Sequence, residues 1–153
     1  LLYMPKPVIP FAHSDFMGEN EIHLDPSSSF LYCDIFNCGR VAMGERFQMK
    51  RYQSKTKIYV GETLAMADHT LLDPSWFAYD TLGLWNNYTH NGLLYLYTPD
   101  GEQKSRWIQM IRDKKPDQVE AGCSECRQGI LLRVLGKSGD AVYDYFEDIA
   151  REV

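Results

Sequence analysis

The chain has 153 residues, of which 44% are hydrophobic, 24% charged and 13% aromatic. This length and composition predict one folded domain with its own core, and exclude a disordered chain, a fibre and a disulfide-dependent mini-protein. The 21 acidic residues outnumber the 16 basic residues, which gives a formal net charge of −5 without any offsetting Lys/Arg cluster. We therefore expect no binding to nucleic acid.

The N-terminal residues and the longest uncharged stretch decide the expected compartment. Residues 1–7 lack the basic and apolar regions of a secretory signal. The longest stretch without Asp, Glu, Lys or Arg, residues 81–99, is interrupted by Asn86, Asn87, His90 and Asn91, which is too polar for a membrane span. We expect a cytoplasmic protein that does not bind membranes. Because the chain does not begin with Met, we also expect it to be part of a longer protein.

Strand patterns follow each other closely in the first half of the chain. Ile22 and Leu24 alternate with charged side chains, which predicts a half-buried strand, and residues 30–38 are largely apolar on both faces, which predicts an inner strand. Further strands are predicted at residues 47–52, 56–60 and 63–72, with a turn at 60–62.

The second half of the chain predicts two more strands and two helices. The strands are expected at residues 93–97 and 130–134, after an irregular aromatic stretch from residue 74. Ser105 is expected to cap a helix over 105–115, and Ser138 a terminal helix over 139–151, because apolar residues recur there at helical spacing. Mostly β structure with two helices argues against a doubly wound α/β sheet.

Histidines and cysteines are the first candidates for chemistry. Nucleotide-binding and serine-hydrolase motifs are absent, and the four histidines (His13, His23, His69 and His90) are isolated, so we expect surface or hydrogen-bonding roles for them. Cys123 and Cys126 have the spacing of a zinc or redox pair, but no second pair exists and nearby glycines predict an exposed loop. Plain thiols in a reducing compartment are the alternative, also for Cys33 and Cys38.

Two acids occupy strand positions at which alternation predicts apolar residues. Asp34 shares a predicted face with Tyr32 and Phe36, and Asp68 shares one with Met66 and Leu72. Burial of a carboxylate is costly unless it is paired, hydrogen-bonded, metal-bound or hydrated. Two interpretations follow: an internal ion pair with a base such as Arg40 or Arg51, or a polar channel that serves as a path for cations.

Four segments carry a resemblance to a known family. Residues 38–47, Cys38-Gly39-Arg40-Val41-Ala42-Met43-Gly44-Glu45-Arg46-Phe47, resemble the GR-x-A-x-GE-x-F signature of the UreD/UreH urease accessory proteins. Residues 7–11 with Phe16 and residues 27–32 are similar to the segment before that signature, residues 68–74 to its D-x-x-x-L-D-P stretch, and residues 129–136 to its last strand before a final helix. The four segments agree in order and spacing over nearly the whole chain.

The resemblance implies a single UreD/UreH-like domain over residues 1–153, with a mainly β fold: a layered, β-helix-like winding of strands flanked by two α-helices. It implies a non-catalytic scaffold and nickel-delivery conduit that binds UreF, UreG through UreF, and the structural subunits of urease, in an accessory complex that can dimerise. Nickel is then in transit, with no tightly bound cofactor. Members of the family are longer, so we expect this chain to lack the N-terminal portion.

The resemblance also assigns roles to individual residues. Asp34 and Asp68 occupy positions of acids that line a water-filled tunnel, the proposed nickel route of the family. Glu45 is a third metal candidate, although its expected role is structural, pairing with Arg40 in the turn. Gly39, Arg40, Gly44, Glu45 and Phe47 form the signature, whose role is structural. Independently of the resemblance, the aromatic segment 76–85 in a chain without a catalytic signature is expected to be a docking surface, with a UreF-type protein as its partner.

Two alternatives compete with this interpretation. One is a metal-binding or redox protein that uses the Cys123/Cys126 pair. The other is an enzyme in which Asp34 or Asp68 is the general base.

Overall fold

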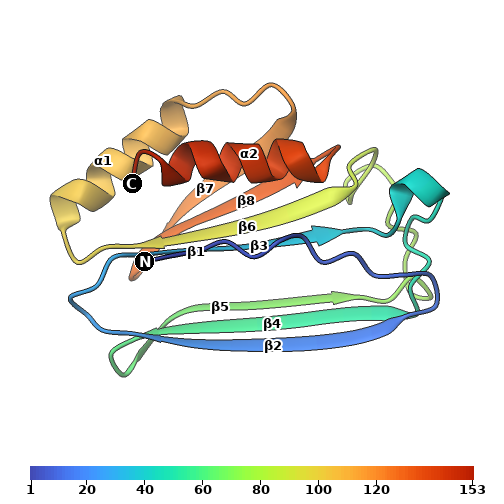
Figure 1. Cartoon of the computed structure of the whole chain (residues 1–153), viewed down its shortest axis with the longest axis horizontal. Coiled ribbons are helices and arrows are strands. Elements are labelled where there is room, and N and C mark those ends of the chain that lie inside the picture. The colour runs from blue at the N-terminus through green and yellow to red at the C-terminus, as the bar shows by residue number, and fades with distance from the viewer.

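The structure is a computed structural model that describes residues 1–153. It has three layers: two helices, a five-stranded sheet and a three-stranded sheet (Figure 1). The five-stranded sheet has the order β1 (Leu2–Tyr3), β3 (Phe30–Asn37), β6 (His90–Tyr97), β8 (Gly129–Gly136), β7 (Val119–Cys126). The three-stranded sheet contains β2 (Asp15–Leu24), β4 (Arg51–Val60) and β5 (Thr63–Leu72). The helices are α1 (Gly101–Asp113) and α2 (Gly139–Ala150), with a short 3-10 helix, η1, at Val41–Met43.

The path of the chain explains the layered winding. From β1 to β4 the chain changes sheet at every step, so that β1 lies parallel to β3 and β2 lies parallel to β4. The remaining pairs are antiparallel. The predicted mainly β, layered fold with two helices is confirmed, and both helices cover the same outer face of the five-stranded sheet (Figure 1). No helix is long and apolar enough to cross a membrane.

Three buried apolar clusters hold the layers together. The largest lies between the helices and the five-stranded sheet and includes Leu31 and Ile35 of β3 and Phe146 of α2. Here α2 packs directly on β6, since a Cβ atom at Gly92 would come within 2.7 Å of the Phe146 ring. The other two clusters lie between the sheets. The first inter-sheet cluster consists of Leu24, Phe30, Tyr32, Ile58, Val60, Met66, Leu93, Tyr95 and Tyr97. The second consists of Phe36, Cys38, Phe47, Met49, Tyr52, Leu72, Tyr79 and Trp85.

Strand β4 differs from its prediction. The two strands expected at 47–52 and 56–60 are one strand, which begins only at Arg51, and Phe47 has a left-handed backbone with φ 49°. Ser54 and Thr56 continue the buried face that Tyr52 begins. These two polar residues on the buried face hid the alternation of the strand, and Ser54 lines the polar space described below. The neighbouring strand at 63–72 is confirmed as β5.

The two helices are confirmed, with one corrected start. Helix α1 is capped by Asp100 and not by Ser105: the Asp100 carboxylate accepts hydrogen bonds from the backbone N–H groups of Glu102 (2.9 Å) and Gln103 (3.1 Å). The helix therefore begins at Gly101, four residues earlier than predicted, and ends at Asp113. Helix α2 begins where predicted, because the Ser138 hydroxyl accepts from the N–H of Ala141 at 3.1 Å.

The segment that contains Cys123 and Cys126 was predicted to be a loop, but it forms the edge strand β7. The strand pairs with β8 in regular antiparallel register, in which Cys123 lies opposite Leu132 and Cys126 opposite Gly129. Successive side chains of a strand point to opposite faces, so residues three apart point away from each other. Cys123 accordingly packs against the helix-side cluster and Cys126 against the first inter-sheet cluster.

Candidate functional site

A small polar cavity separates the two inter-sheet clusters. Its volume is about 20 Å³, enough for about one water molecule, which needs roughly 10–15 Å³. Its lining residues come from both sheets and from the segment before β6: Asp34, Phe36, Tyr52, Ser54, Asp68, Thr70, Trp85, Asn91, Leu93 and Arg133. The cavity is therefore an internal polar space within an otherwise apolar layer.

Along three strands, the inward-facing residues are polar at the level of the cavity and apolar on either side of it. On β3 the order is Tyr32, Asp34, Phe36, and on β5 Asp68 and Thr70 lie between Met66 and Leu72. Strand β4 shows the same order, with Ser54 and Thr56 between two apolar residues. The polar residues form one belt across the sandwich, and the cavity lies in this belt.

Asp34 has no basic partner in the structure. Its carboxylate accepts one long hydrogen bond, 3.5 Å from the Ser54 hydroxyl. Burial raises the pKa of the Asp34 carboxyl above its usual range, and the negative charge of Asp68 raises it further. The two acids are thus close enough to repel each other, and both line the cavity.

Asp68 is the paired acid of the two. Arg133 of β8 forms an ion pair with its Oδ1 atom, and the Thr70 hydroxyl donates to Oδ2 at 3.2 Å. The predicted partners were wrong, because Arg40 pairs with Glu45 and Arg51 pairs with Asp15. Arg133 is 65 residues away from Asp68 in the chain, so that only the packing of β8 over β5 brings the two together.

The polar belt continues from the cavity toward β2. The Tyr32 hydroxyl lies 3.4 Å from the Thr56 hydroxyl, and the side-chain amide of Asn20 donates to Thr56 at 3.3 Å. Burial raises the pKa values of both Tyr32 and Tyr52, with a smaller contribution from the charge of Asp34. Both phenols therefore stay neutral and act only as hydrogen-bonding or packing groups.

The structure does not bring Glu45 together with Asp34 and Asp68. Glu45 lies in the turn after β3, where it forms an ion pair with Arg40 and accepts a hydrogen bond from the N–H of Ala12 at 3.2 Å. Gly39 makes the turn possible: its φ is 143°, and a Cβ atom there would lie 2.7 Å from the Glu45 carbonyl oxygen. Gly44 ends η1 with φ 77°.

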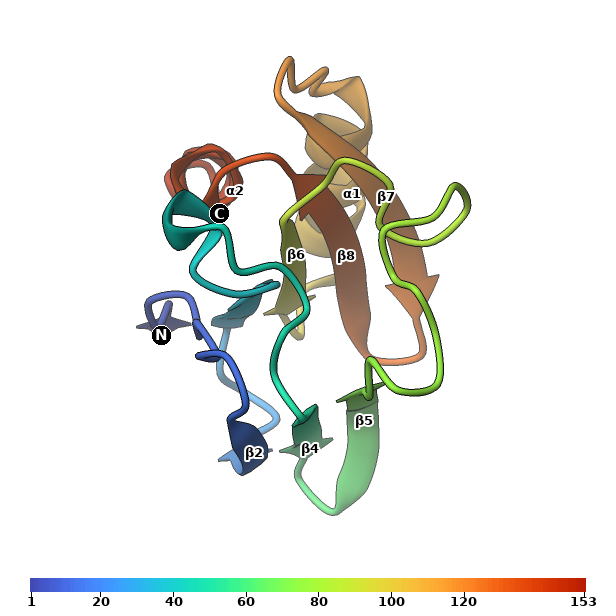
Figure 2. The same cartoon turned by 90° about the vertical axis from the view of Figure 1, so that its right-hand side faces the viewer.

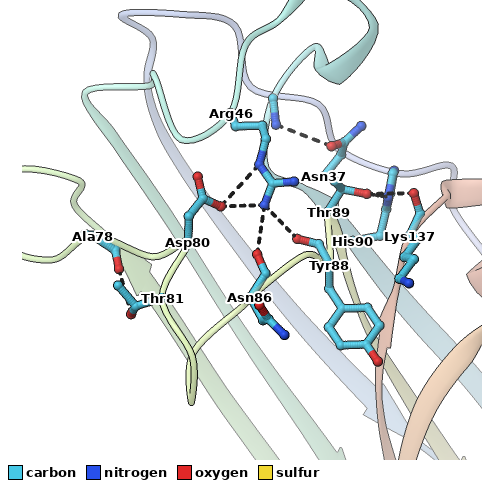
Figure 3. A network of polar contacts seen from close by, with 11 residues as sticks. Asn37, Arg46, Ala78, Asp80, Thr81, Asn86, Tyr88, Thr89, His90 and Lys137 are labelled. Carbon is cyan, nitrogen blue, oxygen red and sulfur yellow. Dashed lines mark hydrogen bonds and ion pairs between the residues drawn. The ribbon is translucent and has the colours of Figure 1, made fainter.

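Two other signature residues connect the turn to the cavity wall. The Phe47 ring meets Trp85 edge to face, with 5.1 Å between centroids, and Trp85 lines the cavity. Arg46 holds the segment that carries Trp85: it forms an ion pair with Asp80 and donates to the carbonyl oxygens of Asn86 (3.1 Å) and Tyr88 (3.3 Å) (Figure 3). Sequence reasoning named Phe47 but missed Arg46, although Arg46 lies inside the signature.

The histidines and cysteines lie outside the cavity. His23 contacts Glu21, His69 contacts Gln53 and His90 contacts Thr89, each at 2.8–2.9 Å. Cys123 and Cys126 lie on opposite faces of β7, so the alternative of a metal or redox site formed by this pair is wrong. All four cysteines are free thiols.

The geometry limits the chemistry of the cavity. Two carboxylates, three hydroxyl groups, an amide and the Arg133 guanidinium line a space for about one water molecule or one small ion, and no organic substrate fits. No group of three or more His, Cys, Asp or Glu side chains could hold a metal ion.

Comparisons with known proteins agree with these observations. The family model "UreD urease accessory protein" matches residues 1–153. The chain is 30% identical to the urease accessory protein UreD of Acetivibrio thermocellus over 139 residues, which are 90% of this chain and 53% of that protein. It is 28% identical to UreH of Helicobacter hepaticus (97% of this chain, 57% of that protein) and 31% identical to UreH of Helicobacter pylori strain J99 (99% and 56%). The chain thus spans little more than half the length of these relatives. It belongs to the UreD family of urease accessory proteins.

Proposed function

We propose that the protein acts in the maturation of urease as a non-catalytic scaffold and as a conduit for nickel. The observation that carries this proposal is the pair of carboxylates in the polar belt between the sheets. An unpaired acid such as Asp34 destabilises a core, so a functional role explains its position better than a structural one, and family membership connects the chain to urease.

The ligand chemistry of the cavity suits an ion that passes through. Asp34 and Asp68 repel each other when both are ionised, and a divalent cation between them removes this repulsion. Carboxylate and hydroxyl oxygens bind a borderline ion such as Ni²⁺ less tightly than thiolates or imidazoles do. Nickel is therefore a substrate of this site, held briefly and released.

The proposed partners are a UreF-type helical protein, UreG through that protein, and the structural subunits of urease, in an accessory complex that can dimerise. Trp76 and Phe77 are exposed, and their segment lies at the end of the sandwich that carries η1 (Figure 1). These exposed aromatic side chains support the docking of a partner protein at that end. The four free thiols agree with work in a reducing compartment such as the cytoplasm.

The decisive experiment measures urease activation in cells that express the intact protein with Asp34→Ala and Asp68→Ala. We expect urease activity to fall by about tenfold or more, the scale on which metal sites respond to the loss of a supporting group, while binding to UreF stays unchanged. The matched control is Asp117→Ala with Asp144→Ala, which removes two exposed acids outside the cavity. Full activation by the first double variant would contradict the conduit, and its failure to fold would assign both acids a purely structural role.

A further inference from the structure

The cavity and a larger surface groove share a wall. The three-stranded sheet ends at β5, whereas the five-stranded sheet extends further to β7 (Figure 2). The overhanging face of β7 and β8, with the segment around Leu84, lines a groove of about 450 Å³. Trp85, Asn91 and Arg133 line both the groove and the cavity. A cation that passes between the two must pass these three side chains.

Arg133 is the only base at this passage. On the sheet it is in register with Leu93 and, one strand further in, with Asp34, so that the three residues form a row on the face toward the three-stranded sheet. Its guanidinium crosses the gap between the sheets to Asp68. The side chain of Arg133 is 49% exposed and that of Asp68 only 14%. From the groove inward, the order is therefore Arg133, Asp68, Asp34.

We propose that Arg133 is a charge gate between the groove and the cavity: its guanidinium takes the place of a divalent cation on Asp68 and must swing into the groove before a cation can enter. This inference rests on the proposed conduit and names the residue that regulates it.

The chemistry of arginine supports this role. A guanidinium carries its charge at every physiological pH, so it repels an arriving cation and neutralises one of the two carboxylates that would attract it. Water can solvate the guanidinium when it leaves Asp68, because the Arg133 side chain is already 49% exposed in the pair, and the groove next to Arg133 has room for the displaced side chain. The gate is therefore closed without a cation, which prevents nonspecific occupation of the carboxylates by the more abundant monovalent ions.

The test is calorimetric titration of the purified intact protein with Ni²⁺ alone. We expect Arg133→Gln to bind Ni²⁺ at least about tenfold more tightly than the unmodified protein, because the variant removes the positive charge that competes with the cation for the Asp68 carboxylate. Arg133→Lys keeps the charge and should bind like the unmodified protein. Arg106→Gln removes an exposed charge from α1 without touching the cavity and should have no effect. Adding Asp68→Asn to Arg133→Gln should cancel the gain.

Three outcomes would overturn the gate: equal affinity of Arg133→Gln and the unmodified protein, an equal gain in Arg106→Gln, or a gain that survives Asp68→Asn. If Arg133→Gln does not fold, Arg133→Met, which keeps the aliphatic part of the side chain, repeats the measurement. The conduit is tested separately by urease activation with the Asp34/Asp68 double variant. If Arg133→Gln shows no gain in affinity but the Asp34/Asp68 double variant loses urease activation, the gate is wrong and the conduit is supported. If that double variant activates urease normally, both proposals are wrong.

Discussion

Asp34 lies on β3 between Tyr32 and Phe36, which pack into the two inter-sheet clusters. Its only hydrogen-bonding side chain is the distant Ser54 hydroxyl, and the charge of another acid, Asp68, raises its pKa. A protein selected for stability alone would place an apolar residue here. Asp34 thus lowers the stability of the fold in return for a negative charge inside it.

The pH dependence of stability tests this view of Asp34. Because burial raises the pKa of Asp34 in the folded protein above its ordinary value of about 3.9, the folded state keeps the proton to a higher pH than the unfolded state does. The stability from this group is then present at low pH and is lost as the pH rises through the folded pKa. Asp34→Asn should raise the free energy of unfolding at pH 7 by about 1 kcal/mol, the scale of single substitutions, and by less as the pH falls toward 4. Urea denaturation at both pH values measures this.

Asp25 provides a control of opposite sign. Hydrogen bonds from the side chain and the backbone N–H of Ser27 lower the pKa of its carboxyl. Asp25→Asn should therefore lower stability at neutral pH and have less effect at low pH. A loss of stability in Asp34→Asn that is larger at pH 7 than at pH 4 would show that Asp34 is stabilised as an anion.

At the level of elements, the signature turn positions the wall of the cavity. Arg46 connects the turn to the segment before β6 through Asp80 and the carbonyl oxygens of Asn86 and Tyr88, and we call this set of contacts the Arg46 clamp. Around this clamp, the Asn37 side chain accepts from the N–H of Gly39 at 3.3 Å and the Thr89 hydroxyl donates to the Lys137 carbonyl at 2.9 Å (Figure 3). Trp85 lies within the clamped segment and packs on Phe36 and Phe47.

Removal of the clamp should loosen this wall. We expect Arg46→Ala to lower the free energy of unfolding by about 1 kcal/mol, since it removes a partly exposed ion pair and two hydrogen bonds to carbonyl groups. Hydrogen exchange should become faster in residues 78–88 and should stay unchanged in β5. Arg40→Ala, which breaks another arginine–carboxylate pair of the same turn, the one with Glu45, is the matched control, and its effect should stay within the turn. Similar exchange of residues 78–88 in both variants would contradict the clamp.

Sequence patterns predicted the elements wherever one face of an element is uniformly apolar. Strand β6 and helix α2 were found for this reason, and the two inward-facing acids were noticed because they interrupt an otherwise apolar face. Strand β4 was divided in two because Ser54 and Thr56 belong to the polar belt, and β7 was missed because an edge strand needs little apolar surface. Arg133 could not be paired with Asp68, because no local pattern shows which strands of two sheets face each other.

At the level of the whole molecule, the polar belt and the end of the sandwich with exposed aromatic side chains are separate regions with different proposed roles. The belt runs between the sheets, whereas Trp76 and Phe77 lie outside the core, 63% and 59% exposed. Their segment, between β5 and β6, lies at the same end of the sandwich as η1 with its exposed Met43 (Figure 1). Because the clamp of Arg46 holds part of this segment, a partner bound at the aromatic end would contact the element that carries Trp85 of the cavity wall.

This arrangement predicts that substitutions at the aromatic end weaken partner binding without changing the stability of the protein. Trp76→Ser with Phe77→Ser in the intact protein should weaken capture by a UreF-type protein at least about tenfold, because aromatic residues carry much of the binding energy of interfaces. The thermal unfolding midpoint should stay the same, since neither side chain is buried. Met17→Ser is the matched control: Met17 is 66% exposed but lies on β2, and its loss should leave capture unchanged. If the Trp76/Phe77 variant is captured as well as the unmodified protein, the partner docks elsewhere, and the exposed rings have no part in the scaffold.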